Sequence, residues 1–156
     1  MTKPEEQVIF ALRERGLTLA TAESCTGGGV GARLTSVSGS SAVYRGGVIS
    51  YCNEIKHKLL GVEQSALDKF GAVSDVVARQ MAQGAKNALQ TDIAVSVTGL
   101  AGPNSDESGK PVGLVYIGLA TADGARAWEY RFSGDREAVR RQAAEAALAQ
   151  IWRCLQ

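Results

Sequence analysis

The sequence has little of several residue types on which common functional sites depend. Its 156 residues contain one histidine, three cysteines and three prolines. One histidine among scattered carboxylates does not favour a dedicated transition-metal site. Three cysteines without a C-x-x-C spacing argue against a disulfide framework or a zinc site. We therefore expect no metal.

The chain also lacks a charge imbalance and a long apolar run. Lys and Arg number 17 against 16 Asp and Glu, so no global field favours nucleic acid or an anionic membrane. The longest apolar run, 114–122, has the length of a strand, and the polar start of the chain is not typical of a signal peptide. We expect one soluble, cytoplasmic domain over residues 1–156, with no nucleic-acid or membrane partner.

Glycine, in contrast, is abundant, and two loops combine it with small hydroxyl side chains. We name residues 22–29 (AESCTGGG) the first glycine loop and residues 97–103 (VTGLAGP) the second glycine loop. Each follows a short apolar run that predicts a buried strand, 17–22 and 93–97. Ligands in open α/β sheets collect at such strand ends, where helix N-termini offer free N–H groups. The loops therefore predict a pocket for a phosphate-bearing or otherwise polar small molecule.

The rest of the pattern alternates between helices and strands. Helices are predicted over 4–15, from the first glycine loop to 34, from Asn53 to 60, after Ser74, and after Asp135. Further strands are predicted over 46–51, 114–122 and 126–132, and the turn at 122–124 is typical of a hairpin. This order predicts an α/β fold: a three-layer α/β/α sandwich on a mixed, mostly parallel sheet with a C-terminal β-hairpin.

Several side chains compete as the catalytic group. His57 would have to serve any Ser-His-Asp triad, but an exposed surface histidine explains it better. Cys25 fits either a thiolate at a helix terminus or a small buried side chain. The remaining option is a serine activated by Lys56, whose pKa burial and the helix dipole would lower, with Tyr51 orienting the proton. The same segment also fits a helix entrance with solvated charges.

Candidate substrate contacts come from both glycine loops and from the last helix. In the first loop they are Ser24, Thr26, Gly27 and Gly28, although a purely structural turn would use the same residues. In the second loop they are Gly99, Ala101 and Gly102. Arg136 and Arg140, one helical turn apart, fit either a clamp for phosphate or carboxylate or an exposed basic face shared with Arg141.

These motifs together resemble the CinA C-terminal domain family, whose stand-alone members include nicotinamide mononucleotide (NMN) deamidases. The resemblance runs from about residue 8 to residue 152. It rests on AESCTGG at 22–28, GSSA at 39–42, GGV at 46–48, Y-x-NE-x-K at 51–56, GAVS at 71–74, VTG-x-AGP at 97–103, KPVG at 110–113 and GDR at 134–136. It implies hydrolysis of NMN to nicotinic acid mononucleotide and ammonia in pyridine nucleotide recycling, without a metal or organic cofactor.

Matched position by position, the resemblance implies Ser41 as nucleophile, Lys56 as its base, and Tyr51 and Thr98 as assisting groups. It also places Ser24 at the substrate, with an arginine of the GDR segment. Full-length CinA proteins carry an N-terminal molybdopterin-binding-type domain, which we do not expect in these 156 residues. Two other hypotheses use the same loops: a module that binds a nucleotide or phosphate metabolite without turnover, and an interaction protein whose glycine loops are only turns.

The positions of Ser41 and Lys56 raise a geometric difficulty. They lie on either side of the predicted strand 46–51, which spans about 20 Å at ~3.3 Å per residue. A serine–lysine hydrogen bond within one chain would require residues 42–45 to double back along that strand. The alternative is a site shared between subunits, and we therefore expect a homodimer.

Overall fold

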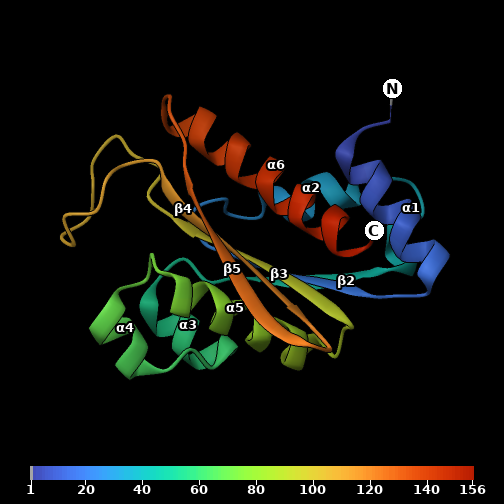
Figure 1. Ribbon diagram of the computed structural model, residues 1–156, viewed down its shortest axis with the longest axis horizontal. Helices are drawn as coiled ribbons and strands as arrows, with labels where there is room; N and C mark the ends of the chain where they lie inside the picture. Colours follow the sequence, from blue (N-terminus) through green and yellow to red (C-terminus); the bar gives the residue numbers. More distant parts are fainter. Residues whose placement is uncertain (1) are drawn as a thin grey trace.

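The computed structural model describes residues 2–156, in which helices and strands alternate (Figure 1). The strands are β1 (Leu19–Glu23), β2 (Tyr44–Ile49), β3 (Ile93–Gly99), β4 (Leu114–Thr121) and β5 (Gly124–Arg131). The helices are α1 (Pro4–Arg15), α2 (Gly29–Thr35), α3 (Asn53–Leu60), α4 (Gln64–Phe70), α5 (Asp75–Leu89) and α6 (Arg136–Cys154). A short 3-10 helix, Ser40–Ala42, precedes β2.

Side-chain caps fix the start of the two longest helices. The Ser74 side chain accepts a hydrogen bond from the Val77 peptide at the start of α5, and Asp135 does the same for Ala138 at the start of α6. Both caps agree with the sequence-based prediction. Helix α4 was not predicted, since a seven-residue segment offers little periodicity to detect. No helix within residues 2–156 is long and apolar enough to cross a membrane.

The strands form one sheet in the order β2-β1-β3-β4-β5. β1 is parallel to both β2 and β3, whereas the β3–β4 and β4–β5 pairs are antiparallel. The predicted mixed, mostly parallel sheet is therefore confirmed, because β4 alone among these five strands runs against the direction of the others. Ala122 and Asp123 connect β4 to β5, and α6 follows, so this pair is not the last element of the chain.

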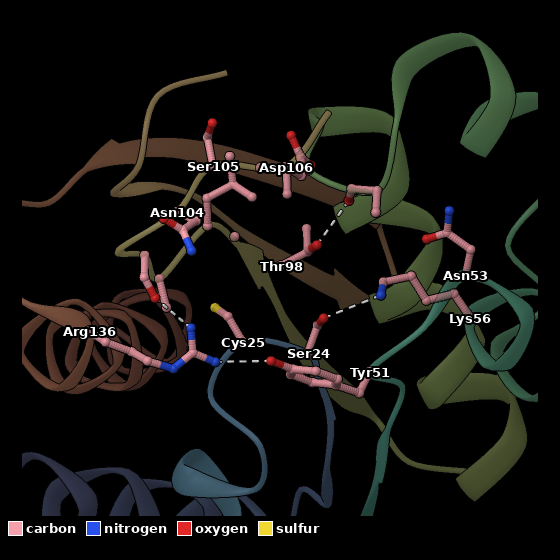
Figure 2. A pocket seen from close by; sticks show the side chains of 16 residues that line it. Ser24, Cys25, Tyr51, Asn53, Lys56, Thr98, Asn104, Ser105, Asp106 and Arg136 are labelled. Atoms are coloured by element: carbon pink, nitrogen blue, oxygen red, sulfur yellow. Dashed lines mark hydrogen bonds between the residues drawn. The ribbon is translucent and has the colours of Figure 1, made fainter. Parts of the chain in front are cut away.

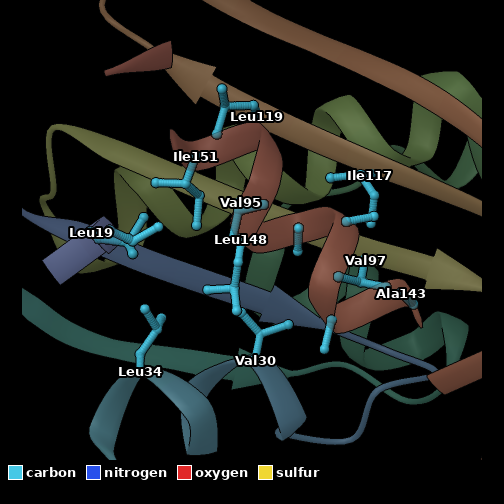
Figure 3. Packing of buried hydrophobic residues seen from close by; sticks show 14 of the residues in the cluster. Leu19, Val30, Leu34, Val95, Val97, Ile117, Leu119, Ala143, Leu148 and Ile151 are labelled. Atoms are coloured by element: carbon cyan, nitrogen blue, oxygen red, sulfur yellow. The ribbon is translucent and has the colours of Figure 1, made fainter. Parts of the chain in front are cut away.

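Helices cover both faces of the sheet, which confirms the predicted α/β/α layers (Figure 1). Helices α1, α2 and α6 pack on one face, where Leu19, Val95, Leu148 and Ile151 belong to the larger apolar core (Figure 3). Helices α3, α4 and α5 pack on the other face over a second core. The interior strand β1, between β2 and β3, is buried along its whole length, whereas burial alternates along the edge strand β2.

The register of the parallel strands brings three loops together. Glu23, the last residue of β1, lies opposite Ile49 of β2 and Val97 of β3. The first glycine loop, the segment after β2 and the second glycine loop therefore meet at one edge of the sheet. This is the edge at which open α/β sheets bind ligands.

Candidate active site

A cavity of about 320 Å³ opens at the carboxyl ends of β1, β2 and β3 (Figure 2). Its volume is within the range of small-molecule sites, about 300–1,000 Å³. The lining combines Ser24 and Cys25 of the first glycine loop, the start of α3, the second glycine loop with the residues after it, and Arg136 of α6. The predicted candidates among the lining residues are Ser24, Tyr51, Lys56, Thr98, Gly99, Ala101, Gly102 and Arg136.

Lys56 is the most unusual of these side chains because it is a lysine in the protein interior, 2% exposed. Its Nζ donates to the Ser50 carbonyl at 2.8 Å and to Ser24 Oγ at 3.2 Å (Figure 2). Within residues 2–156 no acidic side chain forms an ion pair with Lys56. Burial lowers the pKa of Lys56, because desolvation disfavours the ammonium form. The geometry thus provides an amine poised to become neutral next to a serine hydroxyl.

The neighbouring Cys25 is a poor alternative nucleophile. It lines the cavity but is buried, and burial raises the pKa of its thiol to about 11. A thiol with that pKa is protonated near neutral pH, whereas the thiolate is the reactive form. The prediction of a small buried side chain therefore fits Cys25 better than the prediction of an activated thiolate.

Ser41 does not lie beside Lys56, which corrects the expected pairing. Ser41 is exposed on the 3-10 helix before β2 and is not among the lining residues of the cavity, whereas Lys56 follows β2. The chain does not double back along the strand. Ser24 reaches Lys56 instead, because β1 is parallel to β2 and ends at the same edge.

This arrangement removes the reason for a site shared between subunits, since one chain supplies both Ser24 and Lys56. The homodimer stays a prediction. The lone histidine behaves as the simpler interpretation expects: His57 is exposed, and its Nδ1 lies 2.7 Å from the Val62 carbonyl oxygen.

Tyr51, Thr98 and Arg136 complete the predicted set in the cavity wall. Arg136 donates from Nη2 to the Tyr51 hydroxyl at 3.0 Å and from Nη1 to the Gly102 carbonyl at 2.6 Å. Thr98 Oγ1 donates to the Ala72 carbonyl at 2.8 Å. Arg136 thus connects the segment after β2 to the second glycine loop, and it brings a positive charge to the cavity (Figure 2).

The first glycine loop does not present its helix N-terminus to a ligand, which corrects the expected role of Thr26, Gly27 and Gly28. None of these three residues lines the cavity. A buried carboxylate of the protein occupies the anion position instead. Glu23 accepts hydrogen bonds from Thr26 Oγ1 at 2.6 Å and from the peptide N–H groups of Gly28 at 3.2 Å, Val30 at 2.9 Å and Gly31 at 2.9 Å.

Arg140 is also engaged within the protein. It donates from Nε to the Cys25 carbonyl at 3.0 Å and from Nη2 to the Thr26 carbonyl at 3.2 Å. It does not line the cavity. The predicted clamp of two arginines on a substrate anion is therefore reduced to Arg136, because Arg140 holds the back of the first glycine loop.

Sequence reasoning missed several polar side chains of the cavity wall, namely Asn53, Asn104, Ser105 and Asp106. The last three belong to the segment after Pro103, in which no candidate residue was predicted. Their polarity was visible, but their position over the cavity depends on tertiary structure. Among residues 2–156, His, Cys, Asp and Glu form no cluster of three or more that could hold a metal ion.

Fold and site together define an α/β protein with a buried lysine–serine pair in a cavity at the carboxyl edge of its parallel strands. The chain belongs to the CinA C-terminal domain family, whose model matches residues 1–155.

Individual relatives agree with this assignment. The chain is 49% identical over 148 residues to the nicotinamide-nucleotide amidohydrolase PncC of Shigella flexneri, covering 94% of this chain and 90% of that protein. It is 52% identical over 147 residues to a CinA-like protein of Rippkaea orientalis, covering 92% of this chain but only 35% of the relative's length. The crystal structure of a competence/damage inducible protein of Agrobacterium tumefaciens superposes with a TM-score of 0.93 at 38% identity, with full coverage of both chains.

Proposed function

We propose that this protein hydrolyses the carboxamide of NMN to nicotinic acid mononucleotide and ammonia by a serine–lysine mechanism. The observation that carries the proposal is the buried contact between Lys56 Nζ and Ser24 Oγ at the cavity wall. The similarity to the Shigella PncC protein over nearly the whole chain supports the substrate. The proposal replaces Ser41 by Ser24 as the nucleophile and keeps Lys56 as the base.

In the first step, Ser24 Oγ attacks the carboxamide carbon while the neutral Lys56 amine takes the serine proton. Desolvation of Lys56 favours the neutral amine that this step needs. The negative charge that develops on the carboxamide oxygen requires hydrogen-bond donors. The peptide N–H group of Cys25 is suited to this task, because Cys25 follows the nucleophile directly and lines the cavity, and its N–H donates to no acceptor within residues 2–156.

In the second step, Lys56 returns the proton to the amide nitrogen, ammonia leaves, and an ester forms on Ser24. Water then attacks the ester and gives its proton to Lys56, which passes that proton to the departing Ser24 Oγ. Nicotinic acid mononucleotide is released, and the serine hydroxyl and the neutral amine are restored. The carbonyl of Ser50 fixes one proton of the Lys56 amine, which directs the amine toward Ser24. No step requires a metal or an organic cofactor.

The charge at the other side of the cavity orients the substrate. Figure 2 shows Arg136 and Lys56 on opposite sides of the cavity, with Tyr51 between them in this view. Arg136 is suited to bind the phosphate of NMN while the carboxamide reaches Ser24, because a guanidinium matches the geometry of a phosphate. A role in pyridine nucleotide recycling and a cytoplasmic location follow from this substrate as predictions.

Purified protein incubated with NMN tests the proposal through the release of ammonia and nicotinic acid mononucleotide. We expect stoichiometric formation of both products. Binding of NMN without any product would favour the alternative of a non-catalytic nucleotide-binding module. Mass spectrometry of protein quenched during turnover should find the added acyl group on Ser24, and acylation elsewhere would contradict the mechanism.

A further inference from the structure

Two charged side chains hold the first glycine loop from opposite sides. From the end of β1, the Glu23 carboxylate accepts one hydroxyl and three peptide hydrogen bonds, and Glu23 is only 2% exposed. From α6, Arg140 donates to the carbonyl oxygens of Cys25 and Thr26. A carboxylate thus binds the N–H side of the loop and a guanidinium binds its carbonyl side. We name this pair the loop clamp.

The loop clamp determines which peptide groups remain available. The N–H groups of residues 27–31 all have acceptors, namely the Ser24 carbonyl, the Thr26 carbonyl and the Glu23 carboxylate. Within residues 2–156, the N–H groups of Cys25 and Thr26 have none. The loop therefore directs its spare donors to the two residues next to Ser24.

A loop with three consecutive glycines needs such restraint. Glycine loses more conformational freedom on ordering than any other residue, and Gly27 and Gly28 have φ angles of 57° and 102°. A buried carboxylate is unfavourable without donors around it, so Glu23 favours the loop conformation that supplies them. A misplacement of reacting groups by about 1 Å can lower a rate roughly 100-fold.

We propose that Glu23 and Arg140 are positioning residues that hold Ser24, and the free N–H groups after it, in register with Lys56. The proposal rests on the proposed function in that Ser24 is the nucleophile. It assigns no contact with the substrate to either residue. Its consequence is that both side chains control the rate of chemistry at Ser24 rather than the affinity for substrate.

The test compares Glu23→Gln and Arg140→Met with two matched controls. Asp92→Asn changes a carboxylate just before β3 that also accepts a peptide N–H and a hydroxyl, both from Thr18. Arg141→Met changes the next residue of α6, which is exposed. The readouts are kcat and KM with NMN, and the rate and stoichiometry of sulfonylation by phenylmethylsulfonyl fluoride. That reagent forms an O–S bond to the serine and loses fluoride, and the serine proton passes to the base.

We expect Glu23→Gln to lower kcat roughly 100-fold with KM within about threefold, since an amide would turn a donor toward the Gly31 N–H. Arg140→Met should lower kcat about tenfold, and Arg140→Lys, which keeps one cationic donor, should recover part of the loss. In each variant one serine per chain should still be labelled, at a rate that falls in parallel with kcat. Both controls should match the wild type in kcat and in labelling rate.

A different pattern would overturn the proposal. If labelling stoichiometry falls while the rate per reactive chain is unchanged, Glu23 and Arg140 merely maintain the fold. If Glu23→Gln does not fold, Thr26→Val removes only the hydroxyl contact with Glu23, and an unchanged labelling rate would contradict the clamp. If the reagent labels Ser24 of the wild type but the protein leaves NMN intact, the proposed substrate is refuted. The labelling rates of the variants would still test the loop clamp. Turnover of NMN without reaction at Ser24 would refute both.

Discussion

The first and second glycine loops follow neighbouring parallel strands and carry similar residues, yet they use their peptide groups in different ways. In the first loop, Glu23 binds the helix N-terminus, and of the residues after it only Ser24 and Cys25 reach the cavity. In the second loop, residues 98–102 all line the cavity. The difference follows from Glu23 at the end of β1. Its carboxylate accepts the free N–H groups of the first loop, whereas the second loop faces the cavity.

The largest loss of activity should come from changing Ser24, the residue of the first loop whose hydroxyl contacts Lys56, or from changing Lys56 itself. Ser24→Ala and Lys56→Met should each lower kcat by about 10⁴-fold or more, because each removes a group that acts in the chemical step. Ser41→Ala should remain within about twofold of the wild type. Steady-state kinetics with NMN measures all three variants, and an inactive Ser41→Ala next to an active Ser24→Ala would reverse the comparison.

The pH dependence should report the Lys56 amine. The base must be neutral, so below the lowered pKa of Lys56 we expect kcat/KM to rise about tenfold per pH unit and to level off above it. The free energy of unfolding should also rise with pH, in the range between the pKa of Lys56 in the folded protein and the 10.5 of a free lysine. In this range the unfolded chain binds one proton more than the folded protein. Urea unfolding of Lys56→Met over this range should lack that rise.

A smaller loss of activity should follow from removing Arg136, which binds the second loop at the Gly102 carbonyl. Arg136→Met removes the bonds to Tyr51 and Gly102 together with the charge at the cavity. We expect KM for NMN to rise about tenfold or more, since hydrogen bonds to charged groups contribute roughly 1.5–3 kcal/mol, with a lesser fall in kcat. Nicotinamide riboside, which lacks the phosphate, should be affected less by this change. Equal losses for both compounds would argue against a phosphate contact.

The smallest effect should appear at Thr98, whose hydroxyl ties the second loop to the Ala72 carbonyl. Thr98→Val keeps the shape but leaves that carbonyl without its donor, which should lower the free energy of unfolding by about 1 kcal/mol. Activity should fall by less than tenfold, and Thr98→Ser should restore both quantities. A loss of kcat comparable to that of Ser24→Ala would instead give Thr98 a direct part in the chemistry.

The sequence predicted the architecture because local signals determine it. The apolar runs at β1 and β3 and the caps at Ser74 and Asp135 act over a few residues, and all four agree with the structure. The place of β4 in the sheet, antiparallel to β3, was not predicted, since strand order depends on contacts between distant segments.

The site was predicted in part, for the same reason. Lys56, Tyr51, Thr98 and Arg136 belong to the cavity as expected. Which serine lies beside Lys56 depends on which strand is next to β2. No local sequence pattern shows that Ser24, and not Ser41, takes this position. The hydrogen bonds from Glu23 to the first loop were not predicted either, because they require the Glu23 side chain to turn back onto the N-terminus of α2.

The strand order also governs when catalysis can begin as the chain is made. The first 60 residues contain Ser24 and Lys56. The second neighbour of β1 in the sheet is β3, however, and this pairing joins distant residues such as Leu19 and Ile93. Such distant pairing is slow compared with helix formation. During synthesis, the chain thus contains Ser24 and Lys56, the proposed nucleophile and base, before β3 and the second glycine loop have been made. The return of amide hydrolysis during refolding should therefore lag behind the recovery of helical signal and coincide with the docking of β3.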